Sequence, residues 1–510
     1  MIHPLTTSSS NMKENTRRRR ILNLLQHIPT FAFRFIRLLT FVLCLLPAFV
    51  TFACHYMMCD RRVIYYGTDP NGRATLADIF SSTTIFSKRR YLDIYGSCSE
   101  KMITTKTTTT KMTTTKEKKK PVVIFLTGGA WIIGYRMWGT LLARALVPFG
   151  ILVIIPDYRN FPCVDVAGMV EDVDAAIQWV FDHVEEYGGD ANNVILVGQS
   201  AGAHIGEVIV TKKVLDWLRT ERKQYQPPHE GINNHSLSSE LMETNQLKST
   251  YSPQQIRGFI STSCPHNLVD MRLVFHKHGF NANVQWSIFG GLGEGNNNTN
   301  NDGSEGTNND VPAPITRRYS LGLLEGLAPG VFERWSPYHL VMQCHTEYMS
   351  LPPRPSRRTT RTTLRRDNEC CRPSLKEIFP KLCIIHGTAD ETVPVIEAIE
   401  FVSLLNQLHI PTETRMYHGW SHTDPILEAP MCGNHSYHRD IFELVKLWTV
   451  YNDDDVDDGI SIEKETNGNH NSQQRKQRVV DIATFDERHP ILRPICPTVL
   501  VNIARFCNPF

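Results

Sequence analysis

Several features that would mark other classes of protein are missing from this chain of 510 residues. Its net charge is only +2, with 54 Lys and Arg against 52 Asp and Glu, so no bulk positive field attracts nucleic acid to it. The basic runs are local and lie in poorly patterned sequence, which is typical of solvated tails and loops. No nucleic-acid partner is therefore expected.

Paired metal-binding cysteines are also missing. The 13 cysteines show no repeated spacing, and no C-x-x-C pair stands opposite another, so a zinc site is not expected. Their odd number favours mostly free thiols over a disulfide framework, with one or two bridges left open. No internal repeat is present, and no motif implies an organic cofactor.

Much of the chain lacks the hydrophobic pattern of a core. Residues 1–20 are polar and predicted to be disordered, and insertions are predicted near 97–120, 219–253, 291–315, 350–374 and 451–487. Such segments cannot bury enough apolar surface to form domains of their own. The prediction is therefore a membrane-anchoring segment at 21–60, followed by a single domain at 61–510 that carries these insertions on its surface.

One long apolar run is present, at residues 38–58. No Asp, Glu, Lys or Arg occurs between Arg37 and Asp60, and about 20 apolar residues are enough for a helix to span a bilayer. A retained anchor in membrane lipid is predicted, with a cleaved signal peptide and a buried or interfacial helix as alternatives. Basic residues on both sides leave the orientation open, and a weaker apolar run at 21–36 leaves one or two passes open.

Short apolar segments and amphipathic stretches alternate along the rest of the chain. The former predict strands at 63–66, 90–95, 121–126, 151–156, 194–197, 256–260, 382–385 and 412–417. The latter predict helices at 170–187, 203–212, 395–408 and 437–450. This alternation indicates a mostly parallel sheet that helices cover on both faces.

The segment from Gly198 to Gly202 has the sequence G-Q-S-A-G and lies between a predicted strand and a predicted helix. In a G-x-S-x-G turn of this kind the serine sits on a sharp bend that exposes its hydroxyl. The start of the following helix also offers N–H groups to a developing negative charge. Ser200 is therefore the predicted nucleophile, and a plain tight turn is the alternative.

A second glycine-rich segment, from Thr127 to Trp131, follows the strand predicted at 121–126. Acyl transfer develops an oxyanion that needs backbone N–H donors, and a loop of this kind usually supplies some of them. Gly129 and Ala130 are the candidate donors here, together with the residue after the nucleophile. The loop begins with threonine where histidine is usual, which changes what supports it.

Two later loops supply a candidate acid and a candidate base. Asp390 follows a predicted strand and is the expected carboxylate, which would orient the histidine and stabilise its charged form. Glu391 is the alternative acid, and Asp390 could instead cap the next helix. His422 lies deeper than His418 in the loop after the last strand, so it is the preferred base.

The order along the chain is Ser200, Asp390 and His422. The α/β-hydrolases carry their triads in this order, whereas two other groups of serine hydrolases do not. Each motif is weak alone, but four of them follow the ends of predicted strands in the expected order. The predicted fold is therefore the α/β-hydrolase fold, and the predicted chemistry is ester hydrolysis by a nucleophilic serine.

Longer matches extend this pattern. They are LTGGAWIIGYRMWGTLLARAL at 126–146, PDYRNFP at 156–162, GGDANNVILVGQSAGAHI at 188–205, the stretch 256–283, WSP at 335–337, HGTADETVP at 386–394 and HTDPILEAPM at 422–431. Over about half of its length the chain thus resembles the isoprenylcysteine methylesterases, membrane enzymes that remove the methyl ester from a prenylated C-terminal cysteine. The insertions have no counterpart in this resemblance.

The resemblance implies that Ser200, Asp390 and His422 are catalytic. It also implies a set of residues around the substrate carbonyl, which are Gly128, Gly129, Ala130, Gln199 and Ala201. The expected partners are prenylated proteins or peptides that end in a cysteine methyl ester, with no metal and no cofactor. The expected location is the membrane of the endoplasmic reticulum or Golgi.

Fold does not determine substrate, so two alternatives stay open. The first is another ester or amide hydrolase of this fold: a carboxylesterase, a lipase-like enzyme or an arylformamidase. The second is a catalytically silent receptor or scaffold, which would usually have lost a triad residue. The preferred prenyl chain, the choice between free prenylcysteine and protein substrates, and the oligomeric state are left open by the sequence.

Overall fold

The structure is a computed structural model that describes residues 36–67, 89–97, 119–225, 247–290, 330–351, 373–449, 451–452, 477–478 and 484–508. The chain separates into two compact units. The larger unit comprises 60–422 and 435–487, and the smaller comprises 1–59, 423–434 and 488–510. Each unit is described by itself.

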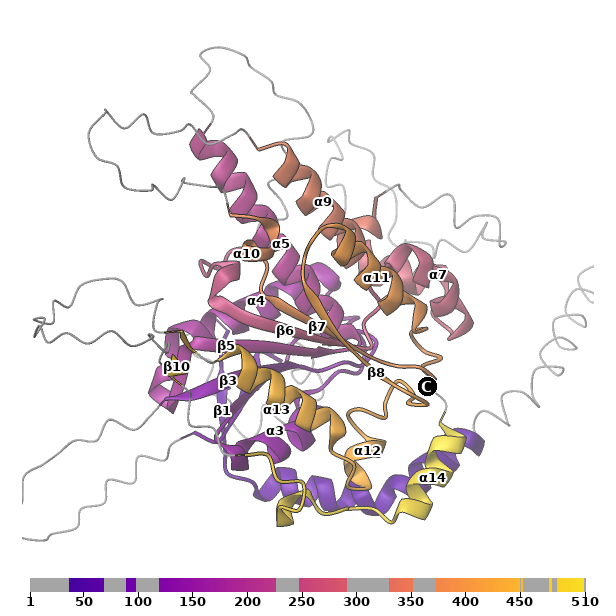
Figure 1. Cartoon of the computed structure of the whole chain (residues 1–510). Coiled ribbons are helices and arrows are strands. Elements are labelled where there is room, and N and C mark those ends of the chain that lie inside the picture. Colours follow the sequence, from indigo (N-terminus) through magenta and orange to yellow (C-terminus); the bar gives the residue numbers. More distant parts are fainter. Residues whose placement is uncertain are drawn as a thin grey trace, which may run out of the picture. The chain divides into compact units, whose positions relative to one another are not determined.

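An eight-stranded sheet forms the centre of the larger unit (Figure 1). Its strands are β1 (Arg61–Tyr65), β2 (Tyr91–Tyr95), β3 (Lys120–Leu126), β4 (Leu152–Pro156), β5 (Gly189–Gln199), β6 (Ile256–Thr262), β7 (Lys381–Gly387) and β8 (Thr412–Tyr417). They lie in the order β1-β2-β4-β3-β5-β6-β7-β8. The β1–β2 and β2–β4 pairs are antiparallel and the others are parallel, which confirms the predicted mostly parallel sheet.

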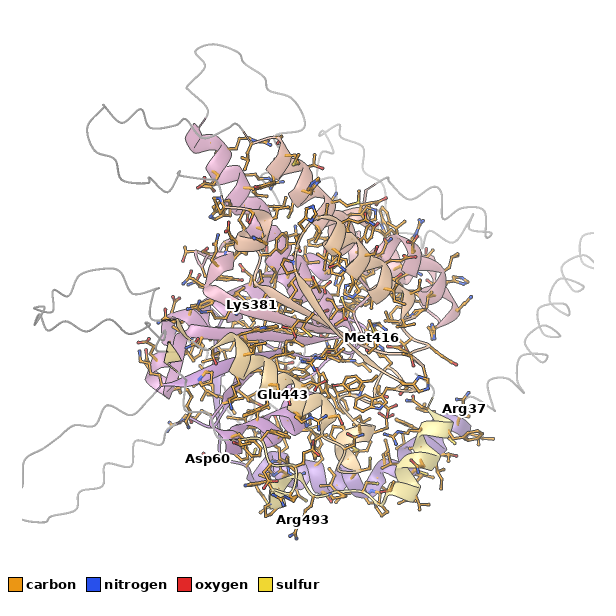
Figure 2. The ribbon with its side chains drawn as sticks, viewed as in Figure 1. Arg37, Asp60, Lys381, Met416, Glu443 and Arg493 are labelled. Carbon is orange, nitrogen blue, oxygen red and sulfur yellow. The ribbon has the colours of Figure 1, made fainter. Side chains whose placement is uncertain are left out.

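The burial of the strands explains their sequences. Residues 121–126 of β3 and all of β4 are buried, so they are continuous apolar runs without alternation. The edge strand β8 (TETRMY) is only partly buried and is correspondingly polar. Lys381 and Met416, labelled in Figure 2, lie near opposite ends of the parallel neighbours β7 and β8. The carboxyl ends of the parallel strands meet at one edge of the sheet, which brings the loops after β3, β5, β7 and β8 together.

Helices cover both faces of this sheet, as predicted. They are α3 (Thr140–Leu146), α4 (Val166–His183), α5 (Ala201–Tyr225), α7 (Leu268–Lys277), α8 (Ala282–Phe289), α9 (Pro337–Met349), α10 (Leu375–Ile378), α11 (Ile396–Gln407) and α13 (Ser436–Trp448). In Figure 1, α3 and α13 lie on one face and α4, α5, α9 and α11 on the other. A two-residue strand pair, β9 (Tyr451–Asn452) with β10 (Gln477–Arg478), completes the described part of this unit.

One predicted helix is longer in the structure. The helix predicted at 203–212 extends to Tyr225 and so enters the polar stretch 219–253. It packs against α4 and α9, and its Lys, Arg and Glu residues are good helix formers. At the other end of the stretch, Tyr251 is buried and its hydroxyl donates to Asp174 of α4 at 2.8 Å. Most of the other predicted insertions, and residues 1–20, lie outside the described residues.

The smaller unit contains the apolar N-terminal run. Its elements are the helix Ile36–Met58, α12 (Glu428–Met431), a 3₁₀ turn (Pro490–Leu492) and α14 (Thr498–Cys507). The helix Ile36–Met58 is long and apolar enough to cross a membrane, although core helices and signal sequences share these properties. Within this unit, Arg37 donates to the Asn508 carbonyl at 2.7 Å. The domain boundaries predicted from the sequence stay a prediction.

Candidate active site

Ser200 lies at the sharp turn between β5 and α5. Its φ is +53°, a left-handed conformation that is strained for a residue with a side chain. The turn is held by the hydrogen bond from the Ser200 N–H to the Thr262 carbonyl of β6, at 2.8 Å. A Cβ on Gly202 would collide with the backbone of Leu126 and Thr127. Glycine at this position therefore allows the nucleophile turn to approach the end of β3.

His422 connects Ser200 to Asp390 through two hydrogen bonds. Its Nε2 lies 2.8 Å from Ser200 Oγ and its Nδ1 lies 2.8 Å from Asp390 Oδ2. With the ring proton on Nδ1, this nitrogen donates to the carboxylate while Nε2 accepts from the serine hydroxyl, as a general base requires. Each of the three residues is at most 8% exposed. The arrangement can therefore take a proton from Ser200 in a site that excludes most water.

Asp390 is held in place by its own loop. Its Oδ1 accepts from the N–H groups of Thr392 at 3.0 Å and Val393 at 2.8 Å, which leaves Oδ2 for His422. Burial by itself raises the pKa of Asp390, but His422, His386 and the Val393 amide together bring this pKa below its ordinary value. Asp390 is thus ionised at neutral pH and can stabilise a charged imidazole.

The alternative acid and base lie elsewhere. Glu391 and His418 have exposed side chains, whereas Asp390 and His422 are buried beside Ser200. His386, the last residue but one of β7, is fully buried, and its Nε2 donates to the Val393 carbonyl at 2.8 Å. Burial lowers the pKa of His386, and its hydrogen bond to Val393 supports the acid loop.

Residues 127–135, which we call the oxyanion loop, follow β3. Three consecutive residues have positive φ: Gly129 at +130°, Ala130 at +49° and Trp131 at +62°. The N–H groups of Ile132 and Ile133 donate to the Gly129 carbonyl at 3.0 and 2.9 Å, which closes a tight turn. Within the described residues, no hydrogen bond involves the N–H of Gly129 or Ala130. These two donors are therefore available to a substrate oxygen.

The remaining predicted site residues surround the same turn. A Cβ on Gly128 would come within 2.9 Å of Ser200 Cβ and would also meet the Gln199 side chain, so Gly128 lies directly beside the nucleophile. Gln199 is buried, and its amide donates to the His422 carbonyl at 3.4 Å. Ala201 is the first residue of α5, where N–H groups have no partner inside the helix. The structure thus brings all eight predicted residues to one place.

Aromatic residues pack around Trp131 of the oxyanion loop, and the part that His204 plays among them was not predicted from the sequence. Trp131 Nε1 donates to His204 Nδ1 at 3.3 Å, and His204 Nε2 donates to the Trp335 carbonyl at 2.7 Å. Trp131 also packs edge-on against Phe275 and Phe289. The pattern G-Q-S-A-G-A-H places His204 one helical turn after Ser200, which was the available signal. Burial lowers the pKa of His204 to about 4, so it remains neutral.

One buried group has the residue types of a metal site. Ligand atoms of Glu207, Cys264 and His266 lie within 4.8 Å of one another. Glu207 Oε2 is 2.8 Å from His266 Nδ1 and 3.3 Å from Cys264 Sγ, which are hydrogen-bond distances to two donors. Burial raises the pKa of Cys264 well above its usual value, so the thiol keeps its proton. The group is therefore explained as a hydrogen-bonded cluster that joins Glu207 of α5 to the residues after β6, and we assign no metal to it.

The fold and the loops together define the class of this protein. The nucleophile turn follows β5, the acid loop follows β7 and the histidine loop follows β8, at the carboxyl edge of a mostly parallel sheet. This is the α/β-hydrolase fold, as predicted. The family model described as BD-FAE matches residues 111–290, which contain the oxyanion loop and the nucleophile turn.

Curated relatives point to a narrower group. The chain is 29% identical over 336 residues to the probable isoprenylcysteine alpha-carbonyl methylesterase ICMEL1 of Oryza sativa subsp. japonica, covering 66% of this chain and 57% of that protein. It is 26% identical over 390 residues to the isoprenylcysteine alpha-carbonyl methylesterase ICME of Arabidopsis thaliana, covering 76% and 64%. The predicted resemblance to isoprenylcysteine methylesterases is thus confirmed. The chain spans little more than half the length of the curated relatives it matches first.

Solved structures of esterases show more distant similarity. Esterase B from Lactobacillus rhamnosis is 11% identical with a TM-score of 0.45, covering 81% of this chain and 97% of that one. The propionate-bound esterase 2 of Thermogutta terrifontis is 16% identical with a TM-score of 0.39, covering 76% and 92%.

Proposed function

We propose that this chain is a carboxylic ester hydrolase that removes the methyl ester from prenylated C-terminal cysteine, with Ser200, His422 and Asp390 as its triad. The observation behind the mechanism is the line of hydrogen bonds from Asp390 through His422 to Ser200 Oγ, at 2.8 Å on each side of the imidazole. A serine hydroxyl is a weak nucleophile until a neighbouring base takes its proton. The names of the relatives support the methyl ester substrate.

The first half of the reaction forms an acyl-enzyme. Ser200 Oγ attacks the ester carbonyl while His422 Nε2 takes the hydroxyl proton, and Asp390 stabilises the imidazolium. The carbonyl oxygen becomes an oxyanion that the N–H groups of Ala201, Gly129 and Ala130 stabilise. When the intermediate collapses, the C–O bond to the methoxy group breaks, and His422 gives its proton to the departing methanol.

The second half restores the enzyme. A water molecule attacks the acyl carbonyl, and His422 takes its proton as it took that of Ser200. The same N–H groups hold the second oxyanion. The bond to Ser200 Oγ then breaks, the serine recovers its proton from His422, and the prenylcysteine carboxylate leaves.

The N-terminal helix fits a lipid-attached substrate. A prenyl chain partitions into the bilayer, so an enzyme anchored there meets its substrate within the membrane plane. The helix Ile36–Met58 has the length and composition of such an anchor. We include membrane anchoring in the proposal, with the endoplasmic reticulum or Golgi as the location implied by the resemblance.

The deciding experiment is methanol release from farnesylcysteine methyl ester by the full-length protein in membranes, compared with Ser200→Ala. We expect wild-type turnover and a loss on the order of 10³-fold or more in the variant. If neither protein releases methanol but a fluorophosphonate still labels Ser200 in the wild type, the site is retained and the prenylcysteine substrate is rejected. Equal turnover by both proteins would show that Ser200 is not the nucleophile.

A further inference from the structure

The oxyanion loop has a backbone that needs support from outside. Ala130 and Trp131 both have left-handed φ values, a conformation that is unfavourable for residues with a side chain and persists only where the surroundings impose it. Thr127, which stands where histidine is usual, does not give this support. Its buried Oγ1 has no hydrogen-bond partner within the described residues. Other side chains must therefore hold the loop in shape.

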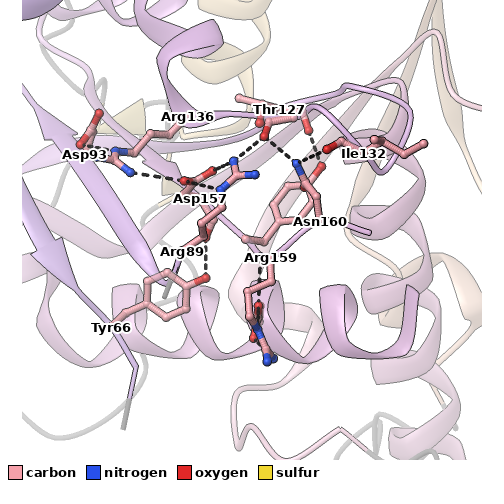
Figure 3. A network of polar contacts seen from close by, with 12 residues as sticks. Tyr66, Arg89, Asp93, Thr127, Ile132, Arg136, Asp157, Arg159 and Asn160 are labelled. Carbon is pink, nitrogen blue, oxygen red and sulfur yellow. Dashed lines mark hydrogen bonds and ion pairs between the residues drawn. The ribbon is translucent and has the colours of Figure 1, made fainter. Parts of the chain in front are cut away.

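Four carbonyl groups of the loop accept hydrogen bonds from outside it. Figure 3 labels two of these loop residues, Thr127 and Ile132, together with the donors Asn160 and Arg89. Thr127 O accepts from the Tyr158 hydroxyl at 2.7 Å, Trp131 O from the Phe161 N–H at 2.9 Å, and Ile132 O from Asn160 Nδ2 at 3.0 Å. Gly134 O accepts from Asn160 Nδ2 at 2.8 Å and also from Arg89 Nη2. Because its carbonyls are fixed from one side, the loop keeps the N–H groups of Gly129 and Ala130 free for substrate.

Arg89 differs from the other donors because it is charged and comes from a distant part of the chain. It forms a two-point pair with Asp157, with Nε at 3.1 Å from Oδ2 and Nη2 at 2.5 Å from Oδ1. Arg136, which directly follows the loop, lies 3.3 Å from Asp157 Oδ2 and 3.0 Å from Asp93 Oδ1. Arg89, Asp93 and Asp157 are each at most 8% exposed, so the guanidinium of Arg89 has a fixed place and direction.

We propose that Arg89 is a positioning residue for the oxyanion hole, held by Asp157 and acting through the Gly134 carbonyl. The inference rests on the proposed ester hydrolysis and names the residue that keeps the oxyanion donors in place. Since the loop acts on the transition state, loss of Arg89 should lower kcat and leave KM nearly unchanged. A role in folding alone would instead lower stability and leave kcat per folded enzyme unaffected.

A matched control lies close by. Arg159 forms a two-point pair with Asp172 at 2.7 and 2.8 Å, and Asp172 belongs to α4. The Arg159 side chain is mostly buried and, among its described contacts, donates nothing to the oxyanion loop. Arg159→Ala therefore removes a comparable buried ion pair without touching the loop.

The test measures kcat, KM and the melting temperature of full-length Arg89→Ala, Arg89→Lys and Arg159→Ala, with and without guanidinium ion at concentrations far below those that unfold the protein. We expect kcat to fall about 100-fold in Arg89→Ala, the size of losing one oxyanion donor, and less in Arg89→Lys, which keeps the charge beside Asp157. Arg159→Ala should keep most of its kcat. Guanidinium should restore kcat in Arg89→Ala only, by filling the vacated place.

Three results would overturn the proposal: equal loss of kcat in Arg89→Ala and Arg159→Ala, a loss confined to KM, or no rescue by guanidinium. If Arg89→Ala fails to fold, unchanged kcat in Arg89→Lys would overturn it as well. The measurements are made on farnesylcysteine methyl ester and on p-nitrophenyl acetate, since an oxyanion hole serves any ester carbonyl. If the wild type hydrolyses p-nitrophenyl acetate but not farnesylcysteine methyl ester, the proposed substrate is rejected. The role of Arg89 is then tested on p-nitrophenyl acetate.

Discussion

Ser200, Asp390 and His422 each lie on a loop that directly follows a parallel strand, and two hydrogen bonds of 2.8 Å join them. The oxyanion loop, which also lies beside Ser200, is held by Arg89 and by Tyr158, Asn160 and Phe161, which follow β4. The first three residues are assembled by the sheet, because its strands end at one edge. The oxyanion loop depends on buried polar contacts between segments that no local motif connects. The residues proposed to carry out the reaction and the residues that hold the oxyanion loop in place thus come from different segments of the chain.

Replacement of Asp390, the proposed triad acid, should disrupt the hydrogen bond to His422 and produce the largest loss of kcat among the variants compared. In Asp390→Asn, the asparagine would stabilise the wrong tautomer of His422, and we expect kcat to fall about 10⁴-fold. The control is Glu391→Gln, because Glu391 is adjacent but exposed and should keep full activity. Steady-state methanol release gives both values. A larger loss in Glu391→Gln than in Asp390→Asn would reassign the acid.

Distortion of the oxyanion loop should produce a smaller loss. In Gly129→Ala the new Cβ would lie 2.6 Å from Gly134 Cα, at a φ of +130°, so the loop must move. We expect kcat to fall about 10²–10³-fold, as when an oxyanion donor is lost. Gly150→Ala is the control, because Gly150 also has positive φ but no atom lies within 4 Å of its added Cβ. Similar kcat losses in the two variants would argue against a role of this loop in catalysis.

A change beside the acid loop should alter only stability, and only in one pH range. Glu397 of α11 accepts from the Asn267 N–H at 2.8 Å, but burial raises its pKa from 4.5 to about 7. Glu397 binds its proton more tightly in the folded protein than in the unfolded chain, which stabilises the folded state. This stabilisation is complete below pH 4.5 and is lost as the pH rises through about 7. Glu397→Gln keeps the hydrogen bond and removes the titration.

Melting temperatures of the wild type and Glu397→Gln between pH 5 and pH 8 test this expectation. As the pH rises, the free energy of unfolding of the variant should increase relative to that of the wild type by about 1–3 kcal/mol. Its kcat at pH 7 should stay close to that of the wild type. If the melting temperatures of the two proteins change with pH in the same way between pH 5 and pH 8, Glu397 does not titrate in this range.

The local patterns predicted the sheet well. The strand β8 has the predicted bounds, and six of the others lie within two residues of theirs, because buried parallel strands are short apolar runs between turns. The strand β5 begins five residues before its predicted start and ends two residues after its predicted end. The helix α5 was predicted too short, since its second half is polar and only its packing on α9 explains it. Five helices described in the larger unit were not predicted, namely α3 and α7 to α10, because their short segments show no clear amphipathic period in the sequence.

In the candidate site, too, local motifs predicted some residues and missed others. The motifs around Ser200, Asp390 and His422 predict all three residues, since each motif is confined to a few consecutive positions, and the structure places them within hydrogen-bond distance of one another. Arg89 carries no such signal, because its partners Asp157 and Gly134 are 68 and 45 residues away. Ion pairs across such separations form only when the sheet places the two segments side by side. Their residue types alone do not predict them.

The sequence by itself determined the class of fold, the order of nucleophile, acid and base, and the resemblance to methylesterases, because all of these depend on local patterns. Only the tertiary structure showed that the preferred residues Asp390 and His422 are buried beside Ser200, whereas the alternatives Glu391 and His418 are exposed. It also decided that the oxyanion loop is supported by a buried arginine network in place of its missing histidine. The physical reason is that burial and charge pairing depend on which distant segments meet, and the chain settles this only when it folds.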